Sequence, residues 1–197
     1  MFSPPFARQT LIITSVASSV LLAYWGVTSW LPTFLATPTS EGGAGLTITK
    51  SAAWLIVLQA GAFCGYLTFG WFADRIGRRP AFTFFMIAAT ALVPLFAFYA
   101  RTPALLLSIG LLVGFFMHGY FSMFGAMLAE LFPTRIRASA QGFCYNSGRL
   151  LSAAAPYGIG AFAQRYGFAS VIAVAALFFA LGGALIWLLP ETKGAAL

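Results

Sequence analysis

One predicted helix in the second half of the chain carries polar side chains at a spacing that suits the binding of an anion. Four of them recur every three or four residues and so lie on one helix face: Gln141, Tyr145, Arg149 and Ser152. An arginine guanidinium is a planar fork that can hold a carboxylate through two hydrogen bonds. We therefore predict that Arg149, with Tyr145 and Asn146, binds the carboxylate of a substrate. The alternative is that Arg149 forms a structural ion pair with Glu130 or with an acid outside this chain.

A histidine and several other side chains in the apolar stretches could contribute to the same site. His118 lies midway along the preceding apolar stretch, and histidine can change its charge near neutral pH. It could carry a coupled proton or hydrogen-bond a substrate; equally, it could be a neutral core histidine bonded to a backbone carbonyl or to Ser122. Five side chains of the first two predicted spans could line a cavity: Tyr24, Trp25, Trp30, Gln59 and Tyr66. The alternative role of these residues is packing or an interfacial aromatic belt, which is favoured for Trp30.

The densest group of charges lies in a short run between two apolar stretches. Residues 70–80 read Gly70-Trp71-Phe72-Ala73-Asp74-Arg75-Ile76-Gly77-Arg78-Arg79-Pro80. Asp74 falls at the C-terminal end of its own helix, where an acid is unfavourable for the helix dipole. We therefore expect it to pair with an arginine or with the N-terminus of a neighbouring helix. Gly70, one turn earlier, would let another helix approach closely. The alternative role of Arg75, Arg78 and Arg79 is to anchor the loop at lipid headgroups.

Two further charged segments follow. Glu130 and Arg137 are separated by six residues, with Arg135 between them, and the chain ends near Leu189-Pro190-Glu191-Thr192-Lys193-Gly194. Exposed ion pairs stabilise by only about 0–1 kcal/mol each. Several in one network can still bias two states that differ by a few kcal/mol. We therefore predict an inner gate made by five side chains: Asp74, Arg78, Glu130, Arg137 and Glu191.

The elements that position these residues are apolar stretches long enough to cross a membrane. The chain has 197 residues, of which 60% are hydrophobic and only 8% charged; soluble domains rarely exceed about half apolar residues. A span needs about 20 apolar residues. Six predicted spans meet this condition, at residues 10–35, 51–73, 81–100, 105–132, 139–163 and 168–189. They form one transmembrane domain over residues 1–197.

The distribution of charge orients the predicted spans. Seven basic residues fall in the tails and two Arg-rich loops on one side, against three on the other: Lys50, Arg101 and Arg165. The positive-inside bias therefore predicts that both termini are cytoplasmic. The net charge of +7 sits at the ends of apolar runs, which favours lipid headgroups as the partner and excludes nucleic acid. Neither a metal-ligand cluster nor a catalytic constellation is present in the pattern, so we expect no metal, no cofactor and no enzyme activity.

The charged segments resemble the cytoplasmic motifs of the major facilitator superfamily. Residues 70–80 resemble its G-x-x-x-D-R-x-G-R-R loop signature, Glu130 and Arg137 its E-x6-R element, and residues 190–194 the P-E-T-K-G terminator of the sugar-porter branch. The resemblance implies an all-α membrane protein with six transmembrane helices in two inverted three-helix repeats, half of a twelve-helix fold. It also implies that the charged network latches the outward-facing state. The gate residues carried over are Gly70, Asp74, Arg75, Gly77, Arg78, Arg79, Glu130, Arg135, Arg137 and Glu191.

The resemblance to sugar porters stops at the interior of the spans. The sugar-contact patterns of the first and fourth helices are absent, with Ile-Ile-Thr-Ser-Val-Ala-Ser standing at residues 12–18. Residues 141–149 are instead similar to proton-linked symporters of organic acids. We therefore predict alternating-access symport of a carboxylate with a proton, in a bacterial inner membrane. The alternatives are a sugar or other solute, or a truncated remnant or scaffold that does not transport. A missing N-terminal six-helix half, or a second copy of this chain, would complete the transporter.

Overall fold

The computed structural model describes residues 1–100 and 102–194, and within this part the regular structure is entirely helical. Arg101, one of the basic residues predicted for the outer side, lies outside the described residues. The elements, in order, are α1 (Pro4–Thr28), α2 (Leu31–Ala36), η1 (Thr39–Glu41), α3 (Ile48–Ile76), α4 (Arg78–Tyr99), α5 (Pro103–Gly119), α6 (Phe121–Leu131), α7 (Thr134–Ser152), α8 (Ala155–Tyr166), α9 (Phe168–Leu185) and η2 (Ile186–Leu188).

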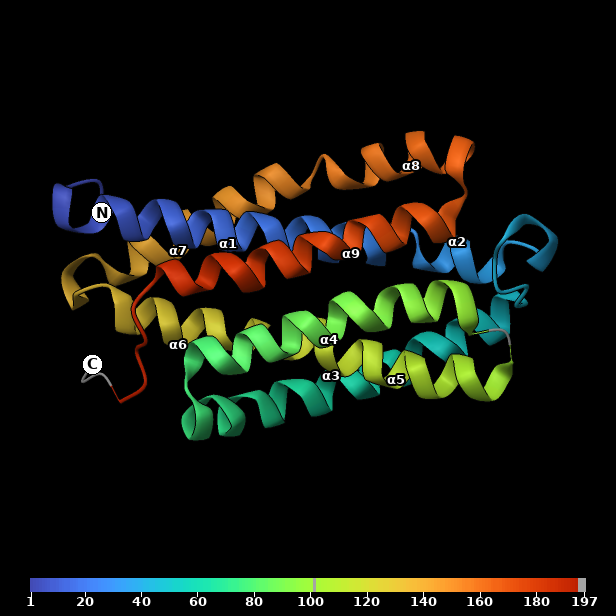
Figure 1. Cartoon of the computed structure of the whole chain (residues 1–197), viewed down its shortest axis with the longest axis horizontal. Helices are drawn as coiled ribbons and strands as arrows, with labels where there is room; N and C mark the ends of the chain where they lie inside the picture. Colours follow the sequence, from blue (N-terminus) through green and yellow to red (C-terminus); the bar gives the residue numbers. More distant parts are fainter. Residues whose placement is uncertain (101, 195–197) are drawn as a thin grey trace.

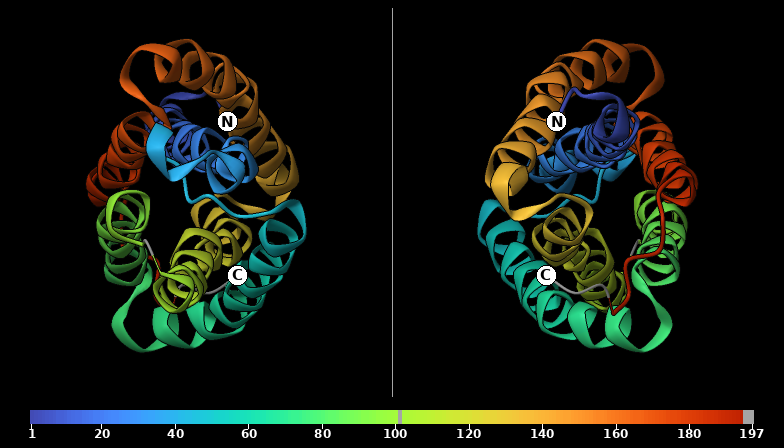
Figure 2. Two further views of the ribbon diagram at one scale, coloured as in Figure 1. Left: turned by 90° about the vertical axis from the view of Figure 1, so that its right-hand side faces the viewer. Right: turned by 90° about the vertical axis from the view of Figure 1, so that its left-hand side faces the viewer.

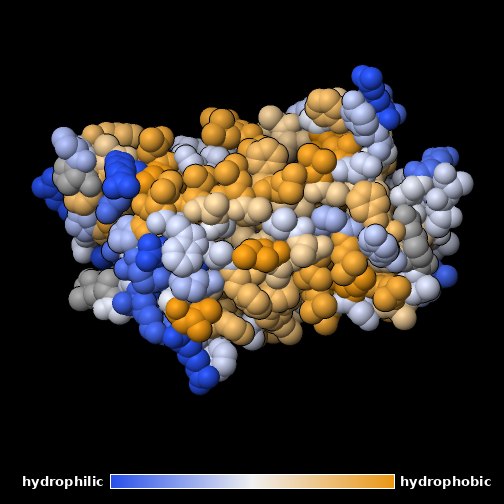
Figure 3. Space-filling view, in the orientation of Figure 1, coloured by the Kyte–Doolittle hydropathy of each residue, from blue (hydrophilic) through white to orange (hydrophobic). Residues whose placement is uncertain are grey.

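The helices lie roughly along one long axis, and both termini lie at the same end (Figure 1). That end also holds the α3–α4 and α6–α7 turns with their arginines, and we call it the Arg-rich end. Apolar residues cover the middle of the molecule in Figure 3, while hydrophilic residues gather toward its ends. Because a bilayer has an apolar core between two polar surfaces, this distribution fits a molecule that lies across a membrane.

Five segments of the described chain are long and apolar enough to cross a membrane: Phe6–Ala36, Ile48–Ile76, Arg78–Tyr99, Pro103–Leu131 and Phe168–Leu188. They match five of the six predicted spans. The predicted span at residues 139–163 is not among them, because α7 carries three arginines and several other polar side chains. The six-span plan with two inverted repeats stays a prediction.

The helices form two groups, as the end-on views show (Figure 2). The first contains α1, α7, α8 and α9, and the second contains α3, α4, α5 and α6; α4 packs on α9 and α6 on α7 to join them. The first predicted three-helix repeat covers residues 10–100 and the second covers residues 105–189. Each of the two groups contains helices from both repeats. A long buried core, including Phe82, Phe85, Tyr120 and Phe179, runs through the molecule.

The tightest contact between helices is that of α3 with α5. At Gly61 an added Cβ would collide with the carbonyl oxygen of Leu111, and at Gly114 with the carbonyl oxygen of Leu58. Only glycine, which has no Cβ, allows two backbones to come this close. The G-x-x-x-G step of Gly61 and Gly65 therefore serves helix packing.

Three helical stretches are broken near their middle or near the end opposite the Arg-rich end. The α1 helix ends before Ser29, α5 and α6 meet at Tyr120, and α7 and α8 are separated by Ala153 and Ala154. The first break is fixed by Trp30, whose indole Nε1 donates to the Pro156 carbonyl at 2.8 Å. The broken segments are the ones that carry Tyr24, His118 and Arg149, so the irregular backbone lies close to the polar side chains of the interior.

Candidate functional site

A cavity of about 380 Å³ opens between α1, α3, α6 and α7. It combines one cation and three phenols with apolar and aromatic walls. The residues that line it are Leu21, Tyr24, Trp25, Tyr66, Phe121, Tyr145 and Arg149. A concave site with apolar walls and a few convergent polar groups is the usual form of a small-molecule site, so we take this central cavity as the candidate site.

Arg149 supplies the only charge in the lining of the central cavity. Its guanidinium forms no hydrogen bond or ion pair within residues 1–100 and 102–194. It does not pair with Glu130, which contacts Arg78 instead. A cation within the span of a membrane protein is expensive unless it has a partner or faces water. Arg149 therefore presents free donors to whatever enters the cavity.

His118 lies behind Tyr24, one layer away from the cavity. Its side chain is buried, with 4% of the residue exposed. The Nε2 atom lies 3.3 Å from the Tyr24 hydroxyl oxygen, and Nδ1 lies 3.0 Å from the Gly114 carbonyl oxygen. The expected alternative contact with Ser122 is absent, because the Ser122 hydroxyl donates to the Gly119 carbonyl at 2.8 Å. Tyr24 thus connects His118 to the central cavity.

Two predicted binding residues lie outside the lining. Gln59 is exposed on α3, and the Asn146 amide is exposed and donates to the Gly142 carbonyl of its own helix at 2.8 Å. Two lining residues were not predicted: Leu21 and Phe121. Leu21 is one helical turn before Tyr24, so the face of Tyr24 could have indicated it. Phe121 follows the break at Tyr120, and the one local signal for that break is Gly119, the last residue of α5.

The Arg-rich end holds a charge cluster centred on Arg78. The Arg78 guanidinium donates from Nη2 to Glu130 Oε1 at 2.9 Å, from Nε to both Glu130 oxygens at 3.3 Å, and from Nη1 to Asp74. The Glu130 side chain is 8% exposed and the Asp74 side chain 69%. Of its two acids, Arg78 therefore shares a low-dielectric environment only with Glu130.

Glu191 caps the N-terminus of α4 and ties the C-terminal segment to it. Its carboxylate accepts the backbone N–H of Arg78 at 2.8 Å and of Arg79 at 3.1 Å, and also those of Thr192 and Lys193. Burial acts to raise the pKa of Glu191, but the four backbone donors outweigh it and hold that pKa below its usual value. The Thr192 hydroxyl in turn donates to Glu130, so Glu191 and its neighbour join the cluster.

The other predicted gate residues lie around this cluster rather than in it. An added Cβ at Gly70 would meet open space, so no helix of this chain approaches there. Arg75 stacks on Trp71 at 3.9 Å, Gly77 has a φ of +106° that suits glycine, and Arg137 Nε donates to the Phe132 carbonyl at 3.4 Å. Arg135 is exposed and has no contact with an acid of the described chain.

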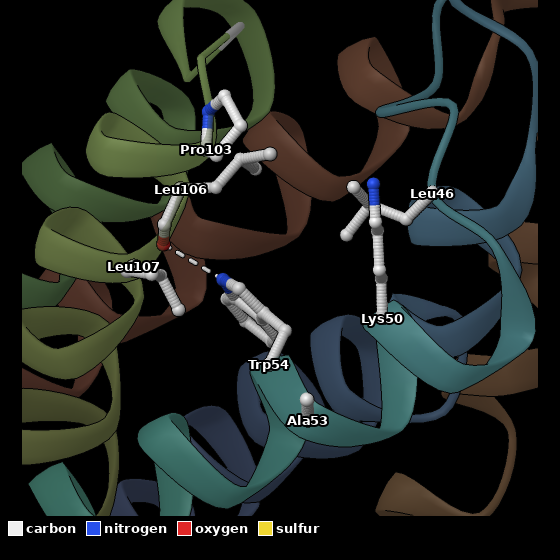
Figure 4. A pocket seen from close by; sticks show the side chains of 7 residues that line it. All are labelled: Leu46, Lys50, Ala53, Trp54, Pro103, Leu106 and Leu107. Atoms are coloured by element: carbon white, nitrogen blue, oxygen red, sulfur yellow. Dashed lines mark hydrogen bonds between the residues drawn. The ribbon is translucent and has the colours of Figure 1, made fainter.

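A second, smaller cavity of about 210 Å³ lies between the first turns of α3 and α5, at the end opposite the Arg-rich end. Its lining, drawn in Figure 4, is Leu46, Lys50, Ala53, Trp54, Pro103, Leu106 and Leu107. The Trp54 indole Nε1 donates to the Leu106 carbonyl at 2.7 Å and so has no free donor. Apart from Lys50, the walls of this cavity are apolar, so it lacks the convergent polar groups of the central cavity.

Among the described residues, no three His, Cys, Asp or Glu side chains are close enough to hold a metal ion. Cys64 is exposed and Cys144 is buried, and both are free thiols.

Comparison with known proteins places the chain in one family of membrane transporters. Residues 13–196 match the Major Facilitator Superfamily. A Haemophilus influenzae protein assigned to metabolite transport is 35% identical over 188 residues, covering 95% of this chain and 44% of that protein. A Cupriavidus pinatubonensis protein assigned to 4-methylmuconolactone transport is 32% identical, covering all of this chain and 45% of that protein. The cis,cis-muconate transport protein of Acinetobacter baylyi is 30% identical, covering 78% of this chain and 36% of that protein.

Solved structures agree on the fold. A POT family transporter in complex with 5-aminolevulinic acid superposes with a TM-score of 0.79 at 18% identity, covering 92% of this chain and 38% of that one. The chain therefore spans less than half the length of the relatives and of this structure. These relatives and structural neighbours are transporters rather than enzymes.

Proposed function

Because the chain belongs to the Major Facilitator Superfamily, we propose that it is part of a transporter that carries small organic acids together with protons. It is an integral membrane protein of a family whose members move small solutes. The relatives assigned to 4-methylmuconolactone and cis,cis-muconate transport support an organic acid as the solute. We further propose a bacterial inner membrane as its location, since the relatives are bacterial.

The observation that carries the proposal is the unpartnered Arg149 in the central cavity. A carboxylate fits the planar fork of a guanidinium through two parallel hydrogen bonds. The phenols of Tyr24, Tyr66 and Tyr145 can donate to the same carboxylate, and Trp25 and Phe121 offer ring faces to an apolar body. A neutral sugar would leave the guanidinium without a counter-charge. The lining therefore favours an acid over a sugar.

Proton coupling is assigned to His118. It is the one histidine of the chain, it is buried, and it contacts the cavity residue Tyr24. A histidine next to a substrate site can exchange a proton during each transport cycle. Gln59 and Asn146 would bind substrate only if the second half of the transporter brings the substrate to their exposed side chains.

The charge cluster serves as the inner gate in this proposal. It ties the α3–α4 turn and the C-terminal segment to Glu130 at the end of α6. Breaking it would free α6 relative to α3 and α4, as a change from outward-facing to inward-facing requires. The proposal places the Arg-rich end and both termini in the cytoplasm, and takes α7 and α8 together as the fifth of six spans.

The length of the chain supports a partner half. The relatives are more than twice as long as the segment that matches them, and transporters of this type bind substrate between two halves. A six-helix N-terminal half would close the open side of the central cavity and approach Gly70. A second copy of this chain is the other arrangement that would close it.

The test is uptake into liposomes. The chain is reconstituted alone and together with an N-terminal six-helix half, and uptake of labelled benzoate, muconate and glucose is followed with and without an inward proton gradient. We expect gradient-driven uptake of the acids and none of glucose. Glucose uptake, or uptake of acid that ignores the proton gradient, would overturn the assignment. No uptake in either arrangement would favour a remnant that does not transport.

The matched control separates the cavity arginine from arginines in general. Arg149→Gln removes the cation from the cavity, whereas Arg165→Gln removes an exposed cation that stacks on Tyr166. A hydrogen bond to a charged group contributes about 1.5–3 kcal/mol, so the first variant should lose roughly 10- to 100-fold in apparent affinity. The second should behave as the unmodified chain. Equal effects of the two variants would contradict a site at Arg149.

A further inference from the structure

We propose that Tyr24 transmits the charge of His118 to the substrate carboxylate, so that binding of the proton and binding of the acid strengthen each other. The inference rests on the proposed carboxylate site at Arg149 and deepens it. It assigns to Tyr24 a positioning role that neither the family nor the relatives' names indicate. Its basis is the pair of hydrogen bonds that hold the His118 ring.

The first step is the tautomer of His118. The Gly114 carbonyl oxygen, 3.0 Å from Nδ1, can only accept a hydrogen bond. Nδ1 must therefore carry a proton in both charge states of the ring. In the neutral ring Nε2 has no proton and can only accept, and the group facing it at 3.3 Å is the Tyr24 hydroxyl. Neutral His118 thus holds the Tyr24 O–H proton away from the cavity.

The second step is the reversal of that hydrogen bond. When His118 binds a proton, Nε2 becomes a donor, and the Tyr24 oxygen must accept from it. The hydroxyl proton of Tyr24 is then free to rotate toward the cavity that Tyr24 lines. No bond other than the new N–H forms, and the proton stays on His118. When His118 is neutral, the Tyr24 oxygen presents only its lone pairs to the substrate carboxylate, which repels them. When His118 is charged, the Tyr24 hydroxyl can donate a hydrogen bond to that carboxylate.

The surroundings reinforce this coupling. The titratable or charged groups around the pair are Tyr66 on α3, Tyr120 between α5 and α6, and Tyr145 and Arg149 on α7. No acid lies among them, since the four acids of the chain are Glu41, Asp74, Glu130 and Glu191. Without a bound acid, the charge of Arg149 therefore makes the electrostatic potential in the cavity positive, and this potential opposes protonation of His118. A bound carboxylate neutralises Arg149 and removes that opposition, in the same direction as the Tyr24 switch.

Thermodynamic linkage makes the effect reciprocal. If protonated His118 strengthens carboxylate binding, the carboxylate must strengthen proton binding by the same factor. One donor gained toward a charged acceptor corresponds to roughly a 10- to 100-fold change in affinity. In an alternating-access cycle such a link favours uptake of the acid and the proton together.

The test uses the fact that His118 is the one histidine of the chain. The chain is labelled with ¹⁵N-histidine and placed in lipid nanodiscs, and NMR reads the tautomer and the protonated fraction with and without benzoate. We expect the Nδ1–H tautomer for the neutral ring. At a fixed pH on the titration curve, benzoate should raise the protonated fraction. An Nε2–H tautomer, or no response to benzoate that binds, would overturn the inference.

Two phenol variants isolate Tyr24. Tyr24→Phe removes the switch, so the pH dependence of benzoate affinity should flatten by roughly tenfold across the His118 titration. Tyr66→Phe removes a cavity phenol that does not contact His118, and it should lower affinity equally at every pH. A persistent Nδ1–H signal in Tyr24→Phe shows that the Gly114 bond and the local fold survive. If Tyr24→Phe keeps the wild-type pH dependence, the inference fails.

The design distinguishes this failure from failure of the proposed function. Arg149→Gln tests the carboxylate site itself and should lower benzoate affinity roughly 10- to 100-fold without changing the His118 tautomer. Benzoate binding that depends on Arg149 but not on Tyr24 would overturn the switch alone. Absence of benzoate binding to the unmodified chain and to its complex with a second half would overturn both proposals.

Discussion

Two acids contact the same arginine at the Arg-rich end, and their removal should have very different effects on stability. Arg78 pairs with Glu130 and with Asp74. The Arg78 and Glu130 side chains are 14% and 8% exposed, whereas Asp74 is 69% exposed. Breaking a buried ion pair costs about 3–5 kcal/mol, because it leaves a charge without compensation. An exposed pair contributes about 0–1 kcal/mol.

Glu130→Gln should therefore destabilise the protein by about 2–4 kcal/mol. The value falls below the full cost of a buried pair, because Asp74 still compensates part of the Arg78 charge. The amide oxygen that replaces the carboxylate can also still accept from the Thr192 hydroxyl. Asp74→Asn should cost less than about 1 kcal/mol. Both substitutions are isosteric with the residue they replace, so packing is the same in each comparison.

The assay is equilibrium unfolding of the purified chain in detergent, with a double-mutant cycle that combines each variant with Arg78→Gln. The coupling energy between Arg78 and Glu130 should exceed that between Arg78 and Asp74 by a factor of about three or more. Raising the salt concentration should weaken only the Asp74 pair, because exposed charges are screened and buried charges are not. Equal coupling energies, or equal sensitivity to salt, would refute the argument from burial.

Two further predictions concern packing and pH. Gly61→Ala would drive a Cβ into the Leu111 carbonyl oxygen, so it should lower the free energy of unfolding by about 1–3 kcal/mol. Gly70→Ala, which meets open space in the same helix, is the matched control and should raise it by up to about 1 kcal/mol through helix propensity alone in the same unfolding assay. The pKa of Glu191 is lowered in the folded chain, so its contribution to stability is present at pH values above its unfolded pKa and is lost as the pH falls through the folded value. Unfolding measured from neutral to acid pH should show this loss, and Glu191→Gln should lack that part of the pH dependence; an unchanged acid profile would show that the backbone donors do not hold Glu191 ionised.

The sequence identified the Arg-rich end because charges cannot stay in hydrocarbon, so their positions between apolar runs mark the turns. It also identified the face of Arg149 and Tyr145, since helical spacing shows which side chains share a side. It did not identify which acid would cap a neighbouring helix. Asp74 was expected to pair with an arginine or with a helix N-terminus; it pairs with Arg78, and Glu191 occupies the N-terminus of α4. Residues 113 positions apart in the chain meet there, and no local pattern encodes that contact.

The spacing of polar residues in the sequence also could not predict which part of each helix faces the central cavity. Gln59 and Tyr66 are seven residues apart and share a helix face, yet Tyr66 lines the central cavity and Gln59 does not. The cavity extends along only part of α3, and Tyr66 is the α3 residue that lines it. The break at Tyr120 brings Phe121 into the lining. Gly119, which ends α5, lies directly before it, but a single glycine does not show which way the next helix turns.

The distribution of acids limits what can neutralise Arg149. Asp74 and Glu130 contact Arg78, and Glu191 contacts Arg79. The fourth acid, Glu41, lies in η1 before α3. The counter-charge for Arg149 must therefore come from outside the described chain, either from a substrate or from an acid on the partner half. The two cases differ in a measurable way. If a partner acid pairs with Arg149, benzoate should bind more tightly to this chain alone than to the complete transporter, because the acid competes for the same guanidinium. If the substrate is the counter-charge, adding the second half should strengthen benzoate binding by enclosing it.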